Sequence, residues 1–88
     1  MKAKITNCNF SKDTTNLAEE LEWVINNQCL EQIALKNPFF NQTVTAKDLE
    51  TGTIYYLALT INMDTLVADL EDTTNGEHFG SFQIEITA

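Results

Sequence analysis

The sequence predicts an α+β fold in which one long helix packs on a curved antiparallel sheet of four to five strands. An apolar residue recurs at every fourth position across residues 17–33, which is the spacing of an amphipathic helix. After this segment, apolar and polar residues alternate in Asn41–Ile61, Thr65–Glu71 and His78–Ala88, as in strands with one buried face. Turn-forming residues separate these strands, so successive strands should pair as antiparallel neighbours in a meander. The 88 residues suffice for a single domain, which spans residues 1–88.

A strand and then the helix precede the meander. Lys2–Phe10 is predicted to be a strand because Ala3 and Ile5 alternate with polar residues. The helix is predicted to run from about Leu17 to about Lys36. Its apolar stripe consists of Leu17, Leu21, Ile25, Cys29 and Ile33, widened by Ala18, Val24 and Leu30. We expect this stripe to face the sheet.

The expected ends of the helix carry capping signals. Asn16 followed by Glu19 predicts a side-chain cap at the start, where acids also favour the helix dipole. Pro38 is expected to end the helix, since proline cannot continue one, and Phe39-Phe40 to cover the exit or pack beneath it. Trp23 lies beside the centre of the apolar stripe. We expect it at the rim of the core, with an exposed binding anchor as the alternative.

Two hairpins are expected in the meander. Gly52 takes a positive φ at little cost, so the chain should reverse at Glu50–Thr53. The Asn-Gly pair within Asp72–Glu77 predicts the second reversal, because both residues tolerate positive φ. Since successive strands alternate in direction, the tips at Asp48–Gly52 and Asp72–Glu77 are expected at one end of the sheet. The Ile61–Asp64 turn is expected at the other end.

The chain carries a strong negative charge. Thirteen acidic residues stand against five lysines and no arginine, which gives a formal net charge of −8 at pH 7. Such a chain repels nucleic-acid phosphates, so direct binding of DNA or RNA is not expected. The charge favours solubility, or a partner protein with a basic surface.

Nothing in the sequence indicates export or membrane insertion. No apolar run approaches the ~18 residues of a membrane span, and the apolar segment of a signal peptide does not follow Met1–Lys4. A cytoplasmic location is therefore expected unless a leader has been removed. Cys8 and Cys29 are expected to be buried free thiols, with a disulfide between them as the open alternative.

No catalytic constellation is visible. His78 is the only histidine and stands beside a turn, where a solvated side chain is the ordinary case. Neither cysteine has the surroundings of an activated thiol. Four acids that could gather around a cation lack the spacing of a calcium loop: Asp69, Glu71, Asp72 and Glu77. The sequence therefore predicts no enzyme activity, no metal site and no cofactor.

The two hairpin tips are the candidate partner-binding site, because loops held on a rigid sheet often carry function. The candidate contact residues are Asp48, Leu49, Glu50, Thr51 and Gly52 in the first tip and Thr73, Thr74, Asn75 and Gly76 in the second. Beside the first tip, Tyr55 and Tyr56 must point to opposite faces of their strand. One of them should lie in the core, and the other on the outer face, either as a contact residue or merely exposed.

The run Gly52-Thr53-Ile54-Tyr55-Tyr56-Leu57-Ala58-Leu59 resembles the Gly-Thr-x-Tyr-Tyr run that plant cystatins and stefins carry just after their first inhibitory loop. Leu21–Asn26 is similar to part of the plant cystatin helix, and Leu66–Leu70 stands where the fourth strand would be. The resemblance to the cystatin superfamily implies a strand and one long helix with a four-strand sheet wrapped around it. It also implies inhibition of papain-like cysteine proteases by a glycine-bearing N-terminal segment, a Gln-x-Val-x-Gly loop and a Pro-Trp second loop.

The inhibitory motifs of that family are only partly present. The first loop aligns with Asp48–Gly52, where the glycine is kept but Asp48 and Glu50 replace glutamine and valine. Burying these two carboxylates unpaired in a protease cleft would cost several kcal/mol. Asp72–Glu77 has no Pro-Trp, and Met1–Phe10 has no glycine. A changed target or a lost activity therefore fits better than tight inhibition of a papain-like protease.

Three functions stay open from the sequence. The first is a cystatin-like inhibitor that binds a partner protein, such as a cysteine protease, through its hairpin tips. The second is an acidic decoy, of the kind that a phage encodes, which blocks a nucleic-acid-binding enzyme by mimicking phosphate charge. The third is a non-inhibitory interaction module of the same fold. Long edge strands also leave the formation of a dimer open.

Overall fold

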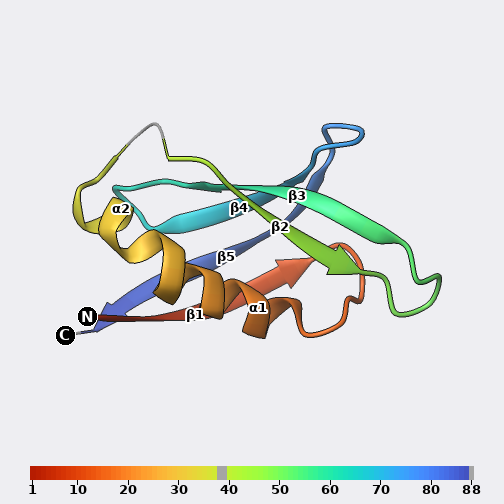
Figure 1. Cartoon of the computed structure of the whole chain (residues 1–88), viewed down its shortest axis with the longest axis horizontal. Coiled ribbons are helices and arrows are strands. Elements are labelled where there is room, and N and C mark those ends of the chain that lie inside the picture. Colours follow the sequence, from red (N-terminus) through yellow and green to blue (C-terminus); the bar gives the residue numbers. More distant parts are fainter. Residues whose placement is uncertain (38–39, 88) are drawn as a thin grey trace.

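The chain forms two layers, a helical segment and a five-stranded antiparallel sheet that curls around it (Figure 1). The computed structural model describes residues 1–37 and 40–87. The strands are β1 (Lys2–Phe10), β2 (Gln42–Lys47), β3 (Ile54–Ile61), β4 (Val67–Asp72) and β5 (His78–Thr87). The helical segment consists of α1 (Leu17–Val24), the π-helical turn η1 (Ile25–Cys29) and α2 (Leu30–Ala34). This arrangement confirms the predicted fold class.

The strand order is β1-β5-β4-β3-β2, so β2 to β5 form the predicted meander and β1 adds a fifth strand beside β5. The sheet curls far enough for the loop after β1 to meet the end of β2. The N–H of Thr15 donates to the carbonyl of Lys47 (3.1 Å), and the N–H of Leu49 donates to the carbonyl of Asp13 (3.2 Å). These bonds partly close the sheet around the helix.

The core lies between the concave face of the sheet and the apolar stripe of the helical segment. The five residues at every fourth position, from Leu17 to Ile33, are all buried, and so is Val24. Of the other two residues predicted to widen the stripe, Leu30 is partly buried and Ala18 is exposed. On the sheet side, the most deeply buried large side chains are Leu57, Leu59, Leu70, Phe82 and Ile84. Each such side chain contributes about 1.5–3 kcal/mol when it leaves water, so this contact is the main force that holds helix and sheet together.

The π turn η1 carries the residue that ties the helical segment to β1. Oδ1 of Asn26 accepts a hydrogen bond from the N–H of Ala3 (2.8 Å), and Nδ2 donates to the carbonyls of Ala3 (2.9 Å) and Glu22 (2.8 Å). The Asn26 amide therefore bonds Ala3 as a neighbouring strand would. Single π turns inside α-helices are rare and are frequently found at functional sites. The apolar spacing, interpreted with an α-helical period, did not predict this one.

The start of the helix differs from the prediction. Asn16 makes no side-chain cap bond and adopts a left-handed conformation with φ 50°. Its carbonyl accepts the N–H of Glu20 (3.0 Å) instead. The loop before it is bonded to β2, so the chain must turn sharply into the helix, and asparagine tolerates this φ better than most residues.

The end of the helix also comes earlier than predicted. The last helical residue is Ala34, and Lys36 turns the chain with φ 51°. The prediction that Pro38 ends the helix and that Phe39 packs at its exit falls outside the described residues. Phe40 is described and packs, partly buried, against the core.

Two side chains that were expected in or beside the core are exposed. Cys8 is exposed on the edge strand β1, next to Asn7, which takes a positive φ (53°) where the register between β1 and β5 shifts. Cys29 is buried as predicted, and both thiols are free. Trp23 is 55% exposed, so the alternative of an exposed side chain is the correct one.

The fourth strand and the second tip differ in detail from the prediction. Leu66 has a positive φ (58°) and precedes the strand, which begins at Val67. The strand ends at Asp72, one residue later than predicted, and the side chain of Asp72 is buried. In the tip, only Gly76 uses a positive φ (73°), while Asn75 does not.

Candidate functional site

Both hairpin tips lie at one end of the sheet, as the alternation of strand direction predicts (Figure 1). The first tip joins β2 to β3, and the second joins β4 to β5. The loop after β1 (residues 11–16) reaches the same end through its bonds to the first tip. The turn between β3 and β4 lies at the opposite end, together with Lys2, which pairs with Thr87.

The carboxylate of Asp48 stabilises the first tip by accepting hydrogen bonds from the backbone of the turn. Its Oδ1 accepts the N–H groups of Glu50 (2.8 Å) and Thr51 (3.3 Å). The bond from Glu50, and after it the bond from Thr51, holds the pKa of Asp48 below its ordinary value. Gly52 supplies the positive φ (74°) that the turn needs, and its N–H donates to the Asp48 carbonyl (3.0 Å). Asp48 is therefore a turn residue, while the side chains of Leu49 and Glu50 are exposed.

The second tip is built in the same way. Oδ1 of Asp72 accepts the N–H of Thr74 (2.9 Å), and Oδ1 of Asn75 accepts the N–H of Glu77 (2.9 Å). All four predicted contact residues of this tip are exposed. None of them is aromatic or charged, so the tip offers a partner a small polar surface.

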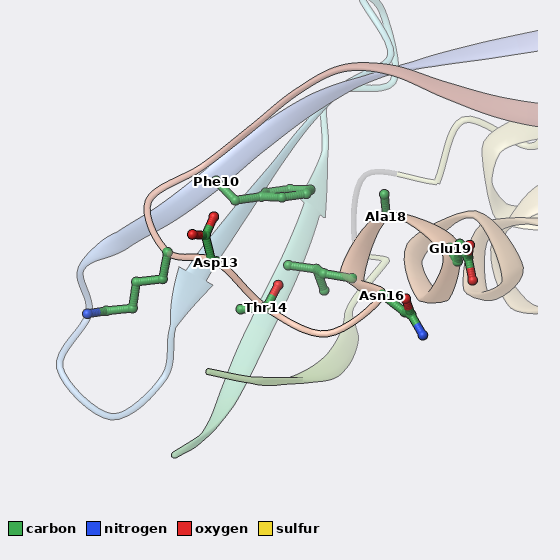
Figure 2. A pocket seen from close by; sticks show the side chains of 8 residues that line it. Phe10, Asp13, Thr14, Asn16, Ala18 and Glu19 are labelled. Carbon is green, nitrogen blue, oxygen red and sulfur yellow. The ribbon is translucent and has the colours of Figure 1, made fainter. Parts of the chain in front are cut away.

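The loop after β1 borders an open pocket of about 450 Å³ at the start of α1, which Figure 2 shows from close by. Asp13 and Glu19 line this pocket, and both are exposed. At the same loop, Nζ of Lys12 lies 5.7 Å from the centre of the Tyr55 ring. The sequence pattern indicated only the start of a helix here, because the pairing of this loop with the end of β2 depends on the curl of the sheet.

The negative charge of the molecule is almost unpaired. The only ion pair among residues 1–37 and 40–87 joins Nε2 of His78 to Oδ1 of Asp69 at 3.4 Å, and both side chains are more than half exposed. None of the five lysines takes part in an ion pair within this part of the chain. Most carboxylates of the described residues therefore have no cationic side chain in direct contact.

Neither thiol is suited to act as a nucleophile at neutral pH. Burial raises the pKa of Cys29 to about 11. Partial burial, and then the charge of Glu22, raises the pKa of Cys8. Because the thiolate is the reactive form, both cysteines are held in the unreactive state. Among the described residues, no group of three or more histidine, cysteine or acidic side chains could hold a metal ion.

The contact residues predicted from the sequence do not include an apolar surface beside β2. Trp23, Ile54 and Tyr56 are all more than half exposed, and all three line hollows beside β2. Alternation along β3 already predicts that Ile54 and Tyr56 share the outer face. The exposure of Trp23, and its place next to β2, follow only from how the helical segment lies on the sheet.

No protein-family model, curated protein or solved structure matches the chain. In the described part of the chain, no helix has the length and apolar character that crossing a bilayer requires. The function must therefore be inferred from the charge, the exposed side chains and the strand edges.

Proposed function

We propose that this chain is a protein-binding module that recognises a basic surface on its partner and acts by occupying that surface. The observation that carries this proposal is the unpaired negative charge: thirteen acids, five lysines, and a single ion pair among the described residues, formed by a histidine. Charges left unpaired on a rigid fold attract and orient a cationic partner. A protein that itself binds nucleic acid has such a surface, and this chain would then compete with phosphate for it.

The end of the molecule that carries the tips is rich in this charge. Five acids lie within the tips and the loop after β1, namely Asp13, Asp48, Glu50, Asp72 and Glu77. Lys12 is the one lysine in these segments, and Lys47 and Glu71 stand directly beside them. The molecule is 39 Å long, whereas the Debye length is about 10 Å at 0.1 M salt. Charges at the tips therefore act on a partner docked there, and charges at the far end do not.

The test uses a fluorescently labelled oligoarginine peptide and two variants with the same change in net charge. One variant combines Glu50→Gln and Glu77→Gln at the tips. The control combines Glu31→Gln in α2 and Glu85→Gln, which pairs with Lys4 near the start of β1. Anisotropy titrations should show weaker binding for the tip variant than for the control, because only the tip charges lie against the docked peptide.

The salt dependence is the second readout. The logarithm of the affinity should fall linearly as the logarithm of the salt concentration rises, with a smaller slope for the tip variant. Equal losses in the two variants would refute the assignment to the tips. Affinity that does not change between about 0.05 and about 0.5 M salt would refute charge recognition altogether.

A second candidate function is inhibition of a papain-like cysteine protease through both tips. It is supported by the resemblance of Gly52–Leu59 to the cystatin run and by the position of the tips at one end. A third contact from the start of the chain does not fit this arrangement, because β1 begins at the opposite end of the sheet. We therefore expect at most weak inhibition of papain, which Thr51→Arg should abolish without disturbing the glycine that the turn needs. Full papain activity at a large excess of the unaltered chain would eliminate this candidate.

A further inference from the structure

One edge of the sheet is open to another strand. The Lys47 carbonyl accepts the N–H of Thr15 in the loop after β1, so it points away from β3. The Tyr56 carbonyl in β3 accepts the N–H of Thr73, which follows β4, so it points toward β4. Backbone groups alternate in direction along a strand, so both observations direct the N–H and C=O of Thr43 and Thr45 away from β3. Apart from a 3.4 Å contact of the Gln42 side chain with the Thr43 carbonyl, these groups have no bond among the described residues.

The opposite edge of the sheet, β1, is partly covered. The Asn26 amide bonds both backbone groups of Ala3. Further along β1, the positive φ of Asn7 and the shift in register break the regular edge. Proteins block free edges with such devices to prevent pairing with other chains. In β2 only the end is covered, where the loop after β1 bonds to Lys47–Leu49.

A groove runs along the open edge, between β2 and the helical segment. It consists of two hollows of about 270 Å³ each, one beside Gln42–Thr45 and the other beside Thr45–Lys47. Both hollows are lined by Glu20 and Thr45, so they lie next to each other. The six residues of β2 span about 20 Å, which matches an extended peptide of similar length.

Large apolar side chains stand along this groove. Trp23 and Tyr56 line the first hollow and Ile54 lines the second, with exposed fractions of 55%, 58% and 53%. They are three of the seven large hydrophobic side chains that are exposed in the described part of the chain. Exposed aromatic side chains next to a pocket are typical anchors of a binding surface.

We propose that β2 binds an extended segment of the partner protein as a sixth strand of the sheet. Backbone groups of Thr43 and Thr45 form the ladder, while Trp23 and Tyr56 contact apolar side chains of the segment. Glu20, which lines both hollows, contacts a lysine or arginine of the segment. Strand addition of this kind takes its affinity from the main chain and its specificity from alternate side chains. The inference that the segment is positively charged rests on the proposed function, whereas the open edge of β2 is observed independently of it.

A second copy of the chain fits this edge less well. Each copy has a net charge of −8, and two copies paired along β2 would bring two Glu20 side chains into one interface. Like charges at an interface oppose association, whereas a basic segment neutralises them.

The probe is an acetylated and amidated peptide of alternating lysine and valine. Trp23 is the only tryptophan of the chain, so its emission reports directly on the groove. Thr45→Pro removes the N–H at the open edge but no bond to β3, so the sheet should persist. Thr45→Val is the matched control, because it keeps the N–H. A peptide methylated at alternate backbone nitrogens is a second control, which leaves the protein unchanged.

Binding of the peptide should shift the Trp23 emission, and Thr45→Pro should weaken binding at least about fivefold, the effect of one lost backbone bond. Thr45→Val should bind within about twofold of the parent chain, and the methylated peptide should fail to bind. If Thr45→Pro does not fold by circular dichroism, the methylated peptide decides the question alone.

Equal binding of both peptides would refute the strand edge. If that binding still weakened with salt, the charge-based function would stand and only its location along β2 would be wrong. Failure of both the lysine-valine peptide and oligoarginine to bind would refute the two proposals together. A dimer of the parent chain that Thr45→Pro dissociates in sedimentation would show that a second copy occupies the edge, and would also overturn the proposal.

Discussion

Replacement of Asn26 by alanine is predicted to be among the most damaging single changes outside the apolar core. The amide makes three hydrogen bonds, two of them to the backbone of Ala3, which is 0% exposed. Truncation would leave a buried N–H and a buried C=O without partners. Each such group costs about 1–3 kcal/mol, so with partial access of water we expect a loss of about 2–4 kcal/mol. This is a large share of the free energy of unfolding of a typical domain, which is roughly 5–15 kcal/mol.

Asn27→Ala is the matched control. Asn27 is the next residue of the same π turn, but its side chain is exposed and donates only to the Trp23 carbonyl (2.8 Å). Urea titrations should show a loss below about 1 kcal/mol for this variant. If both variants change the free energy of unfolding by the same amount, within about 0.5 kcal/mol, that result would falsify the role assigned to the hydrogen bonds between Asn26 and Ala3. Amide exchange at Ala3 should accelerate in Asn26→Ala only.

Three further predictions concern packing, pH and exposure. Gly80→Ala should destabilise the fold by about 1–3 kcal/mol in urea, because a Cβ there would lie 2.6 Å from the Phe10 ring; a neutral effect would mean that β1 can move away. Burial raises the pKa of Cys29 from 9.0 to about 11, so this thiol loses its proton at a lower pH in the unfolded chain than in the folded one. The free energy of unfolding should therefore fall as the pH rises through that interval. Cys29→Ala should abolish that part of the pH dependence in denaturation curves, and an unchanged curve would contradict it. Trp23→Ala should cost less than about 1 kcal/mol in thermal melts, since the ring is 55% exposed; a larger loss would place it in the core.

The elements that were predicted correctly are those that depend on near neighbours in the chain. The fourfold spacing from Leu17 to Ile33 identifies the buried face of the helix, since all five residues at that spacing are buried. Gly52 and Gly76 identify the turns, because each supplies the positive φ on which its hairpin depends. Alternating strand direction then brings both tips to one end, since short connections leave no other choice.

The errors arise where distant parts of the chain meet. Asn16 suggested a helix cap, but its loop is bonded to β2, and that bond sets its backbone conformation. Cys8 was expected to be buried, but it lies on the edge strand β1 beside an irregular register and is exposed. Nothing in the spacing around Asn26 indicates that its amide bonds the backbone of β1.

The sequence by itself therefore determined which segments are helix and strand, which face of each is apolar, and that the molecule is strongly acidic. These properties follow from periodicity, turn residues and composition, which act over a few residues or over the whole chain at once. Only the tertiary structure decided that β1 lies beside β5, that Asn26 covers Ala3 at the free edge of β1, and that the edge of β2 stays open next to Trp23. Those features depend on how far the sheet curls around the helix, and the curl is a collective result of packing that no local pattern encodes.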